Sequence, residues 1–133
     1  MSTFESIPYG IKFQMEVYNY STWILEPSGS FCESGYISSP PKSILPGSKG
    51  IVLGHKMANC ATGACGVVSW NIISSKMGNE MSQKIAVMYS CPFNFNHYSN
   101  YLAVGIFNPI LVDTDKQLFK RMYYDDGKSG MKK

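Results

Sequence analysis

A short segment of the chain gathers aromatic rings and amide side chains without any formal charge. The sequence CPFNFNHYSNY, from Cys91 to Tyr101, contains four aromatic residues, three asparagines and one histidine. Ring faces attract a quaternary ammonium group, and each such contact contributes about 0.5–2 kcal/mol. Serine and tyrosine hydroxyls can donate hydrogen bonds to a phosphate. A surface that combines these groups would recognise phosphocholine, which carries both an ammonium and a phosphate.

The two halves of this segment lead to different expectations. Phe93 and Phe95 alternate as the core-facing residues of a strand do, which favours a packing role for them. Tyr98 and Tyr101 follow the asparagine-rich turn and are better candidates for an exposed surface. The pattern therefore predicts a binding surface in the second half of the segment.

The sequence contains no recognisable catalytic or metal-binding pattern. The two histidines have no acidic motif nearby, and no P-loop, dinucleotide-binding glycine motif or nucleophile elbow is present. No residue near Ser90 or Cys91 in the sequence is placed to act as a general base for a nucleophile. The cysteines, at positions 32, 60, 65 and 91, match no standard zinc site. We expect a protein that binds rather than an enzyme, with no metal ion or cofactor.

Length and charge limit the classes of partner. The chain has 133 residues, 44% of them hydrophobic, which predicts a single domain over residues 1–133. A net charge of +3 is too small to indicate nucleic acid as a partner. Six of the twelve basic residues lie between Lys116 and Lys133. Such a basic tail is either a solvated terminus or an attraction for an anionic membrane surface.

Hydrophobic periodicity predicts a mostly β chain. Residues 11–20 alternate between apolar and polar side chains, which is typical of a half-buried strand. Glycine and proline turns separate the predicted strands, and this arrangement favours a β-sandwich. We expect EPSGS (26–30) to end the second strand and residues 38–50 to form a loop. The remaining predicted strands are 22–25, 50–56, 66–73, 84–91 and 101–107.

One helix is predicted near the C-terminus, in DKQLFKRMYYDD (115–126). Either Asp113 or Thr114 is expected to cap it. Leu118 and Met122 are four residues apart and so share one face. Since adjacent helical residues point in different directions, the tyrosine pair that follows must leave at least one ring facing away from the core.

Three blocks of the sequence resemble the actinoporins, the cytolysin family of sea anemones, which also has relatives outside anemones. ATGACGVVSW (61–70) resembles a strand of that family. IAVMYSCPFNFNHYSNYLAVGIF (85–107) resembles its strand, its aromatic loop ending in Tyr-Ser-Asn and its next strand, and LFKRMYYDD (118–126) resembles its tyrosine-ended helix. The resemblance implies a β-sandwich flanked by helices. Together with the strand pattern, it predicts a mostly β fold, a β-sandwich with one flanking α-helix near the C-terminus.

The resemblance also implies a function and a site. Members of the family bind sphingomyelin or phosphocholine headgroups, oligomerise on the membrane and permeabilise it. The implied phosphocholine-binding positions are Ser34, Cys65, Ser90, Pro92, Tyr98, Phe119, Tyr123 and Tyr124. The implied membrane-interface positions are His97, Tyr101 and Leu102.

Several positions depart from the family pattern. Cys65 stands where the family often has valine, and Phe119 stands where it usually has tyrosine, so one hydroxyl is missing. Glu33 precedes Ser34, where many members have a basic residue, and a carboxylate there disfavours a phosphate. Residues 1–10 also lack the length and periodicity of the amphipathic helix with which the family lines its pore.

These departures favour membrane-lipid binding over pore formation, with a homo-oligomer on the membrane as a further implication. The resemblance implies secretion or a place at the target-cell membrane. Because no signal peptide is visible at the start of the chain, a cytosolic location also stays open. Two other hypotheses remain. One is a soluble, lectin-like carbohydrate-binding module of the same sandwich architecture, and the other is an inert fragment whose family strands beyond residue 126 are missing.

Overall fold

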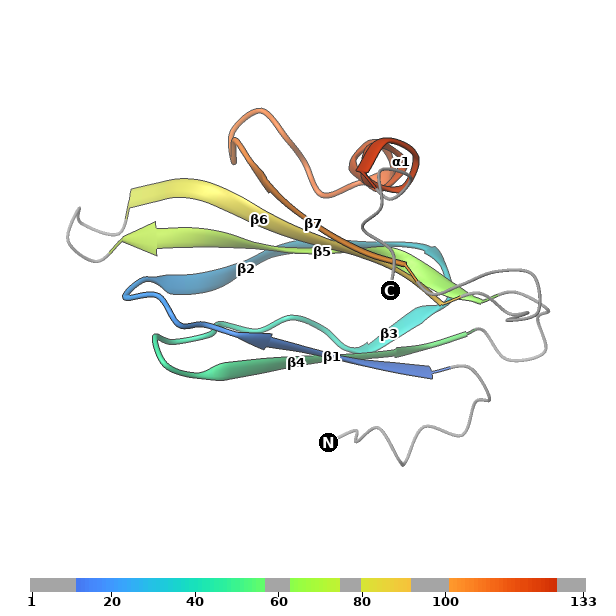
Figure 1. The fold of residues 1–133 in the computed structure, drawn as a ribbon, viewed down its shortest axis with the longest axis horizontal. Helices are drawn as coiled ribbons and strands as arrows, with labels where there is room; N and C mark the ends of the chain where they lie inside the picture. Colours follow the sequence, from blue (N-terminus) through green and yellow to red (C-terminus); the bar gives the residue numbers. More distant parts are fainter. Residues whose placement is uncertain (1–11, 57–62, 75–79, 92–100, 127–133) are drawn as a thin grey trace.

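Two antiparallel sheets lie face to face in this computed structural model, which describes residues 12–56, 63–74, 80–91 and 101–126 (Figure 1). The strands are β1 (Lys12–Tyr18), β2 (Ile24–Ser34), β3 (Tyr36–Ser39), β4 (Lys49–His55), β5 (Ala64–Ser74), β6 (Glu80–Cys91) and β7 (Tyr101–Phe107), followed by helix α1 (Lys116–Arg121) and the π-helical turn η2 (Met122–Asp126). The smaller sheet has the order β1-β4-β3 and the larger has the order β2-β5-β6-β7. The predicted β-sandwich with a flanking C-terminal helix is confirmed.

The space between the sheets is filled by the inward-facing residues of both. Along β1 the predicted alternation is confirmed, since Met15 is buried while Gln14 and Glu16 are exposed. Trp70 of β5 is fully buried in this inner cluster, and its indole N–H donates to the carbonyl of Lys42 at 3.0 Å. This bond satisfies the polar atom of a large core side chain, as burial requires.

The outer face of the larger sheet is also covered. Val67, Met88 and Ala103 project toward the helix side and pack with Leu118 and Met122, all of them buried. A sheet that is buried on both faces has nearly continuous apolar strands. The runs GVVSW and KIAVMY therefore have few exposed positions, and α1 is fixed against the sheet (Figure 1).

The expectation that residues 26–30 end the second strand is wrong. Strand β2 continues to Ser34, with Pro27 opposite Trp70 and a register shift between Pro27 and Gly29. Within the described sheet β2 is an edge strand. An edge strand tolerates proline because the missing N–H can lie on the side away from the ladder, and a bulge absorbs the irregularity.

Two further details differ from the sequence-based expectations. Tyr36–Ser39 form strand β3, which the proline-rich composition that follows concealed. The helix is capped by Asp115, whose carboxylate accepts from the backbone N–H of Leu118 at 3.1 Å, and not by Asp113 or Thr114. The hydroxyl of Thr114 is already engaged by sheet side chains, those of Ser69 and Lys84.

Gly66 lies where the backbone of β2 and a buried side chain of β6 approach β5 closely. A Cβ atom at this position would lie 2.2 Å from the carbonyl oxygen of Phe31 and 2.8 Å from the hydroxyl of Tyr89. The Tyr89 hydroxyl also lies 3.7 Å from the sulfur of Cys32, so its ring spans β5 and links the two neighbouring strands. The absence of a side chain at Gly66 is what allows this crossing.

Replacing Gly66 with alanine should lower the free energy of unfolding by about 3 kcal/mol, the upper end of the usual range for overpacking. Urea unfolding followed by tryptophan fluorescence measures the change. Gly47→Ala is the control, because Gly47 has φ +77° but nothing near its added Cβ. Gly47→Ala should lower the free energy of unfolding by about 1 kcal/mol, because only the positive φ opposes the new side chain. A loss at Gly66 no larger than that at Gly47 would contradict the packing account.

Candidate functional site

Four predicted site residues form one row across the larger sheet. Ser34 pairs with Cys65, Cys65 with Ser90, and Ser90 with Tyr101, one residue from each of the four strands. Directly paired residues of antiparallel strands project from the same face. Cys65 and Tyr101 pack with the outer cluster, so this face is the one that α1 covers. We call Ser34, Cys65, Ser90 and Tyr101 the cross-strand row.

Aromatic rings from the helical segment gather at the Tyr101 end of the row. The ring of Tyr123 lies edge-on to that of Tyr101, with centroids 5.9 Å apart. Its centroid is also 5.7 Å from that of Phe119 and 5.1 Å from that of Tyr124. We call Tyr101, Phe119, Tyr123 and Tyr124 the aromatic cluster. Tyr101 thus belongs to both the row and the cluster, although the family resemblance implied only a membrane-interface position for it.

The helix sets the exposure of the two adjacent tyrosines. Leu118, Phe119 and Met122 are buried and anchor the segment, whereas Tyr123 is half-buried and Tyr124 is 54% exposed. The expectation that one ring of the pair faces away from the core is confirmed. The arrangement presents ring surface to solvent beside the buried anchors.

Phe31 is a neighbour of the site that sequence reasoning missed. Its ring centroid lies 6.3 Å from that of Phe119, and its half-buried side chain packs against the outer cluster. The predicted break at Pro27 removed this stretch from the expected strands. A period of two carried on from Leu25 would place Phe31 on the inner face, and the register shift between Pro27 and Gly29 moves it to the outer face, so no local pattern would have found it.

The remaining predicted site residues do not join this group. Pro92, His97 and Tyr98 lie outside the described residues, as do Phe93 and Phe95, so their roles stay predictions. Leu102 packs with the cluster between the sheets, on the opposite face from the row. Its proposed contact with the membrane interface is not tested by this placement.

The thiol in the middle of the row is held in its neutral form. Burial raises the pKa of Cys65 to about 11, with the nearby Glu33 carboxylate as the next contribution. Burial also raises the pKa of Cys91. Cys32, Cys65 and Cys91 are all free thiols. Beside Cys65, the Ser34 hydroxyl donates to the carbonyl of Gly63 at 3.1 Å. The row therefore offers uncharged polar groups at neutral pH.

Two features are absent from the described segments. No group of three or more histidine, cysteine or acidic side chains there is arranged to hold a metal ion. No helix in those segments has the length and apolar character needed to cross a bilayer.

The fold places the chain in a class of helix-covered β-sandwiches with solved members. The structure of the lipid binding protein Nakanori superposes with a TM-score of 0.66 at 15% sequence identity, covering 94% of this chain and 55% of that one. At this identity the likeness establishes the fold alone.

Sequence comparison identifies the family. The family model described as sea anemone cytotoxic protein matches residues 34–132. The chain is 33% identical over 119 residues to Tereporin-Ca1 of Terebra anilis, 29% over 120 residues to Tereporin-Ts1 of Terebra subulata and 30% over 122 residues to Echotoxin-2 of Monoplex parthenopeus. The chain therefore belongs to the sea anemone cytotoxic protein family. The matches cover 87%, 88% and 90% of this chain but only 60%, 55% and 42% of those relatives.

The raised pKa of Cys65 predicts how stability depends on alkaline pH. An ordinary thiol has a pKa of 9.0, and that of folded Cys65 is about 11. Between these values the unfolded chain loses a proton that the folded chain keeps, so rising pH favours unfolding. Urea midpoints measured from about pH 8 to about pH 11 should fall, and fall less steeply in Cys65→Ser. The urea midpoint of Cys65→Ser should still fall somewhat as the pH rises, because burial also raises the pKa of Cys91 and of Tyr89.

Ser34→Ala provides the control for this measurement, because it changes the same row without removing a group that titrates in this range. Its urea midpoint should fall with pH as steeply as that of the unmodified protein. If the urea midpoint fell with pH as steeply in Cys65→Ser as in the unmodified protein, Cys65 would not be the group whose raised pKa causes the fall.

Proposed function

We propose that the protein binds the phosphocholine headgroup of membrane lipids at the cross-strand row and the aromatic cluster. The observation that carries the proposal is the convergence of the two groups at Tyr101. Hydroxyl-bearing residues from β2 and β6 line up with this tyrosine, and the rings of the helical segment meet it. One end of the sandwich thus combines polar donors with ring surface.

The aromatic cluster supplies the chemistry for the choline half of the ligand. A quaternary ammonium binds ring faces without needing a hydrogen bond, and it gains most where several ring faces surround it. Tyr123 has the rings of Tyr101, Phe119 and Tyr124 within 6 Å of its own. Because Tyr124 is more than half exposed, a headgroup can reach the cluster from solvent.

The row supplies the chemistry for the phosphate half. The hydroxyl of Ser90 can donate to a phosphate oxygen, that of Ser34 can do so by exchanging its bond to the carbonyl of Gly63, and the neutral thiol of Cys65 does not repel the phosphate. None of the four row residues is basic, and the carboxylate of Glu33 lies close enough to influence Cys65. Such a site favours a zwitterionic headgroup over an anionic one, since its attraction depends on the ammonium.

Known proteins with a related sequence or a similar fold support this proposal. The family is described as cytotoxic, and Nakanori, which shares the fold, is described as lipid binding. We extend the proposal to sphingomyelin as the lipid, and to assembly and permeabilisation at a target-cell membrane after binding, as a non-enzymatic process. Dye release from the vesicles used in the binding assay separates permeabilisation from binding.

Vesicle sedimentation tests headgroup recognition. The protein should bind vesicles that contain sphingomyelin or phosphatidylcholine more tightly than vesicles of phosphatidylglycerol at the same salt concentration. Soluble phosphocholine should compete for the same site. Equal binding to all three vesicle types, with no competition, would contradict the proposal.

Removing the exposed ring of the cluster should weaken this binding. Tyr124→Ala is expected to reduce affinity for sphingomyelin vesicles about 2- to 30-fold, the range for one lost ring contact with a cation. Tyr18→Ala is the matched control, because Tyr18 is 52% exposed against 54% for Tyr124 but lies at the end of β1. The same loss in both variants would show that the effect is not specific to the cluster.

A further inference from the structure

A second aromatic surface lies at the turn between β1 and β2, outside the site described above. Tyr20 is 89% exposed, Tyr18 is 52% exposed and Trp23 is 42% exposed. The rings of Tyr18 and Tyr20 are nearly parallel, with an interplanar angle of 12° and centroids 6.1 Å apart. Large exposed rings close together are unusual on a soluble surface and mark interaction sites.

A buried amide holds this turn in one conformation. Asn19 is only 4% exposed, and its side-chain N–H groups donate to the carbonyls of Trp23 and Ile44 at 2.7 and 3.0 Å. Its side-chain oxygen accepts from the backbone N–H and the hydroxyl of Ser21. Its backbone bonds to the neighbouring loop at Gly47 and Ser48. A turn with every group of its central amide satisfied is rigid, so its rings are held in place before any ligand arrives.

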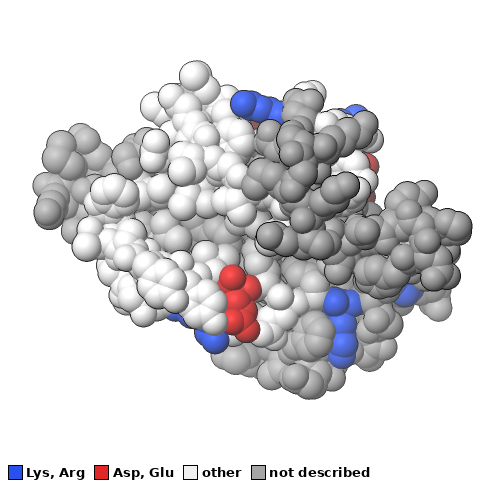
Figure 2. Space-filling view, in the orientation of Figure 1, with Lys and Arg blue, Asp and Glu red and all other residues white. Residues whose placement is uncertain are grey.

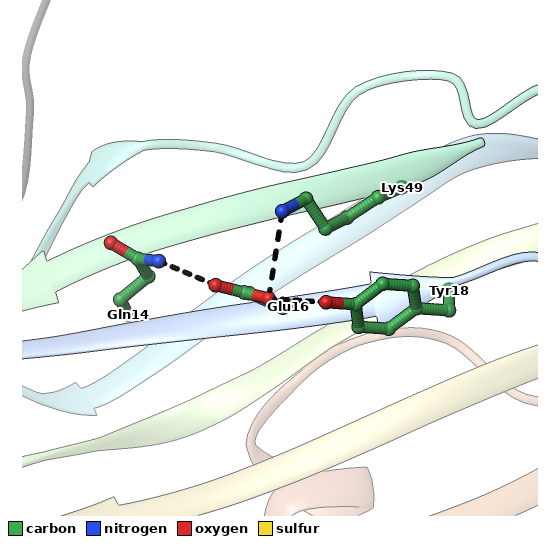
Figure 3. Close-up of polar contacts among 4 residues, drawn as sticks. All are labelled: Gln14, Glu16, Tyr18 and Lys49. Atoms are coloured by element: carbon green, nitrogen blue, oxygen red, sulfur yellow. Dashed lines mark hydrogen bonds and ion pairs between the residues drawn. The ribbon is translucent and has the colours of Figure 1, made fainter.

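Polar side chains on the smaller sheet frame the rings. The Glu16 carboxylate accepts from the amide of Gln14 and from the hydroxyl of Tyr18, both at 2.7 Å, and Lys49 lies 3.7 Å from it (Figure 3). The Lys49 ammonium is also 5.6 Å from the centroid of the Tyr18 ring. The hydrogen bond from Tyr18, followed by that from Gln14 and the charge of Lys49, lowers the pKa of Glu16. The Glu16 side chain is therefore an ionised carboxylate at neutral pH.

This surface is remote from the cross-strand row. The turn leads directly into β2 at Ile24, and the row begins at Ser34, the other end of the same eleven-residue strand. At about 3.3 Å per residue, the two ends of this strand are about 33 Å apart. A protein that binds a membrane through the row therefore presents this turn away from the bilayer.

We propose that the turn surface made by Tyr18, Tyr20 and Trp23, with Glu16, Gln14 and Lys49, binds a neutral carbohydrate. The C–H face of a pyranose ring is apolar and slightly positive, and it stacks on an aromatic ring face. Its hydroxyls both donate and accept, which matches a frame that carries a carboxylate, an amide and an ammonium. Tyrosine and tryptophan are suited to this role because they give a large contact area with little conformational entropy to lose.

Charge argues for a neutral sugar over the other partners of an aromatic patch. Glu16 and Lys49 compensate each other, so the frame has no net charge to attract an anionic membrane. Charged side chains of both signs are scattered over the face drawn in Figure 2, with no large basic patch among the described residues shown there. Binding of the turn to a membrane or to a second copy of the chain is an alternative result that the experiment below would detect.

The test is binding of the full chain to an array of immobilised neutral glycans ending in galactose, N-acetylgalactosamine, N-acetylglucosamine or mannose. We expect the unmodified protein to bind at least one of these glycans, and the corresponding free sugar to displace it. Tyr20→Ala should lower the array signal about tenfold or more, while Tyr20→Phe keeps the ring face and should retain most of it. Tyr124→Ala leaves the turn intact and should not alter the signal.

Each other outcome overturns the proposal, and only a loss of vesicle binding in Tyr20→Ala would also bear on the headgroup site. No array signal from folded protein would exclude the neutral carbohydrates tested. Unchanged binding in Tyr20→Ala would place any sugar elsewhere. Loss of vesicle binding in Tyr20→Ala would make the turn a lipid contact, and loss of self-association, measured by sedimentation, would make it a contact between copies. The near-complete exposure of Tyr20 keeps the variant foldable, and a urea unfolding curve confirms that it is folded.

Discussion

The packing of the C-terminal helical segment on the outer face of the larger sheet is the interaction on which the candidate lipid site depends. Leu118, Phe119 and Met122 are buried against strands β5, β6 and β7, and this burial fixes where the following tyrosines lie. Without it, the rings that meet Tyr101 would have no defined position. Small and medium side chains on the sheet face, such as Ala103, leave the room into which the helix fits.

The sequence predicted those parts of the fold that depend on local pattern. The alternation around Met15 and the apolar run around Val67 are visible in any window of a few residues, and both became strands. The predicted second strand ends too early, because Pro27 and Gly29 are typical of turns. Only the edge position of β2 explains why the strand tolerates them. Edge position is a property of the whole sheet, so no local pattern reports it.

In the candidate site, too, local sequence and long-range pairing contribute different things. Ser34, Cys65 and Ser90 were assigned by family resemblance, one residue at a time, and nothing in their spacing along the chain places them side by side. Their alignment comes from the strand register, which is set by long-range pairing and by the bulge just before Ser34. Tyr101 was expected at a membrane surface, and its contact with Tyr123 appears only once the helix is packed. The turn before β2 and the contact between β7 and the helical segment thus carry two different aromatic surfaces.

The most direct test of the headgroup site is a nuclear Overhauser measurement between phosphocholine and the aromatic protons of the protein. The account predicts contacts from the choline methyl protons to the rings of Tyr101 and Tyr123, and the assignment of the latter is checked with Tyr123→Phe. Contacts confined to the rings of Tyr18 and Tyr20, or no contact with any described ring at a saturating phosphocholine concentration, would contradict it.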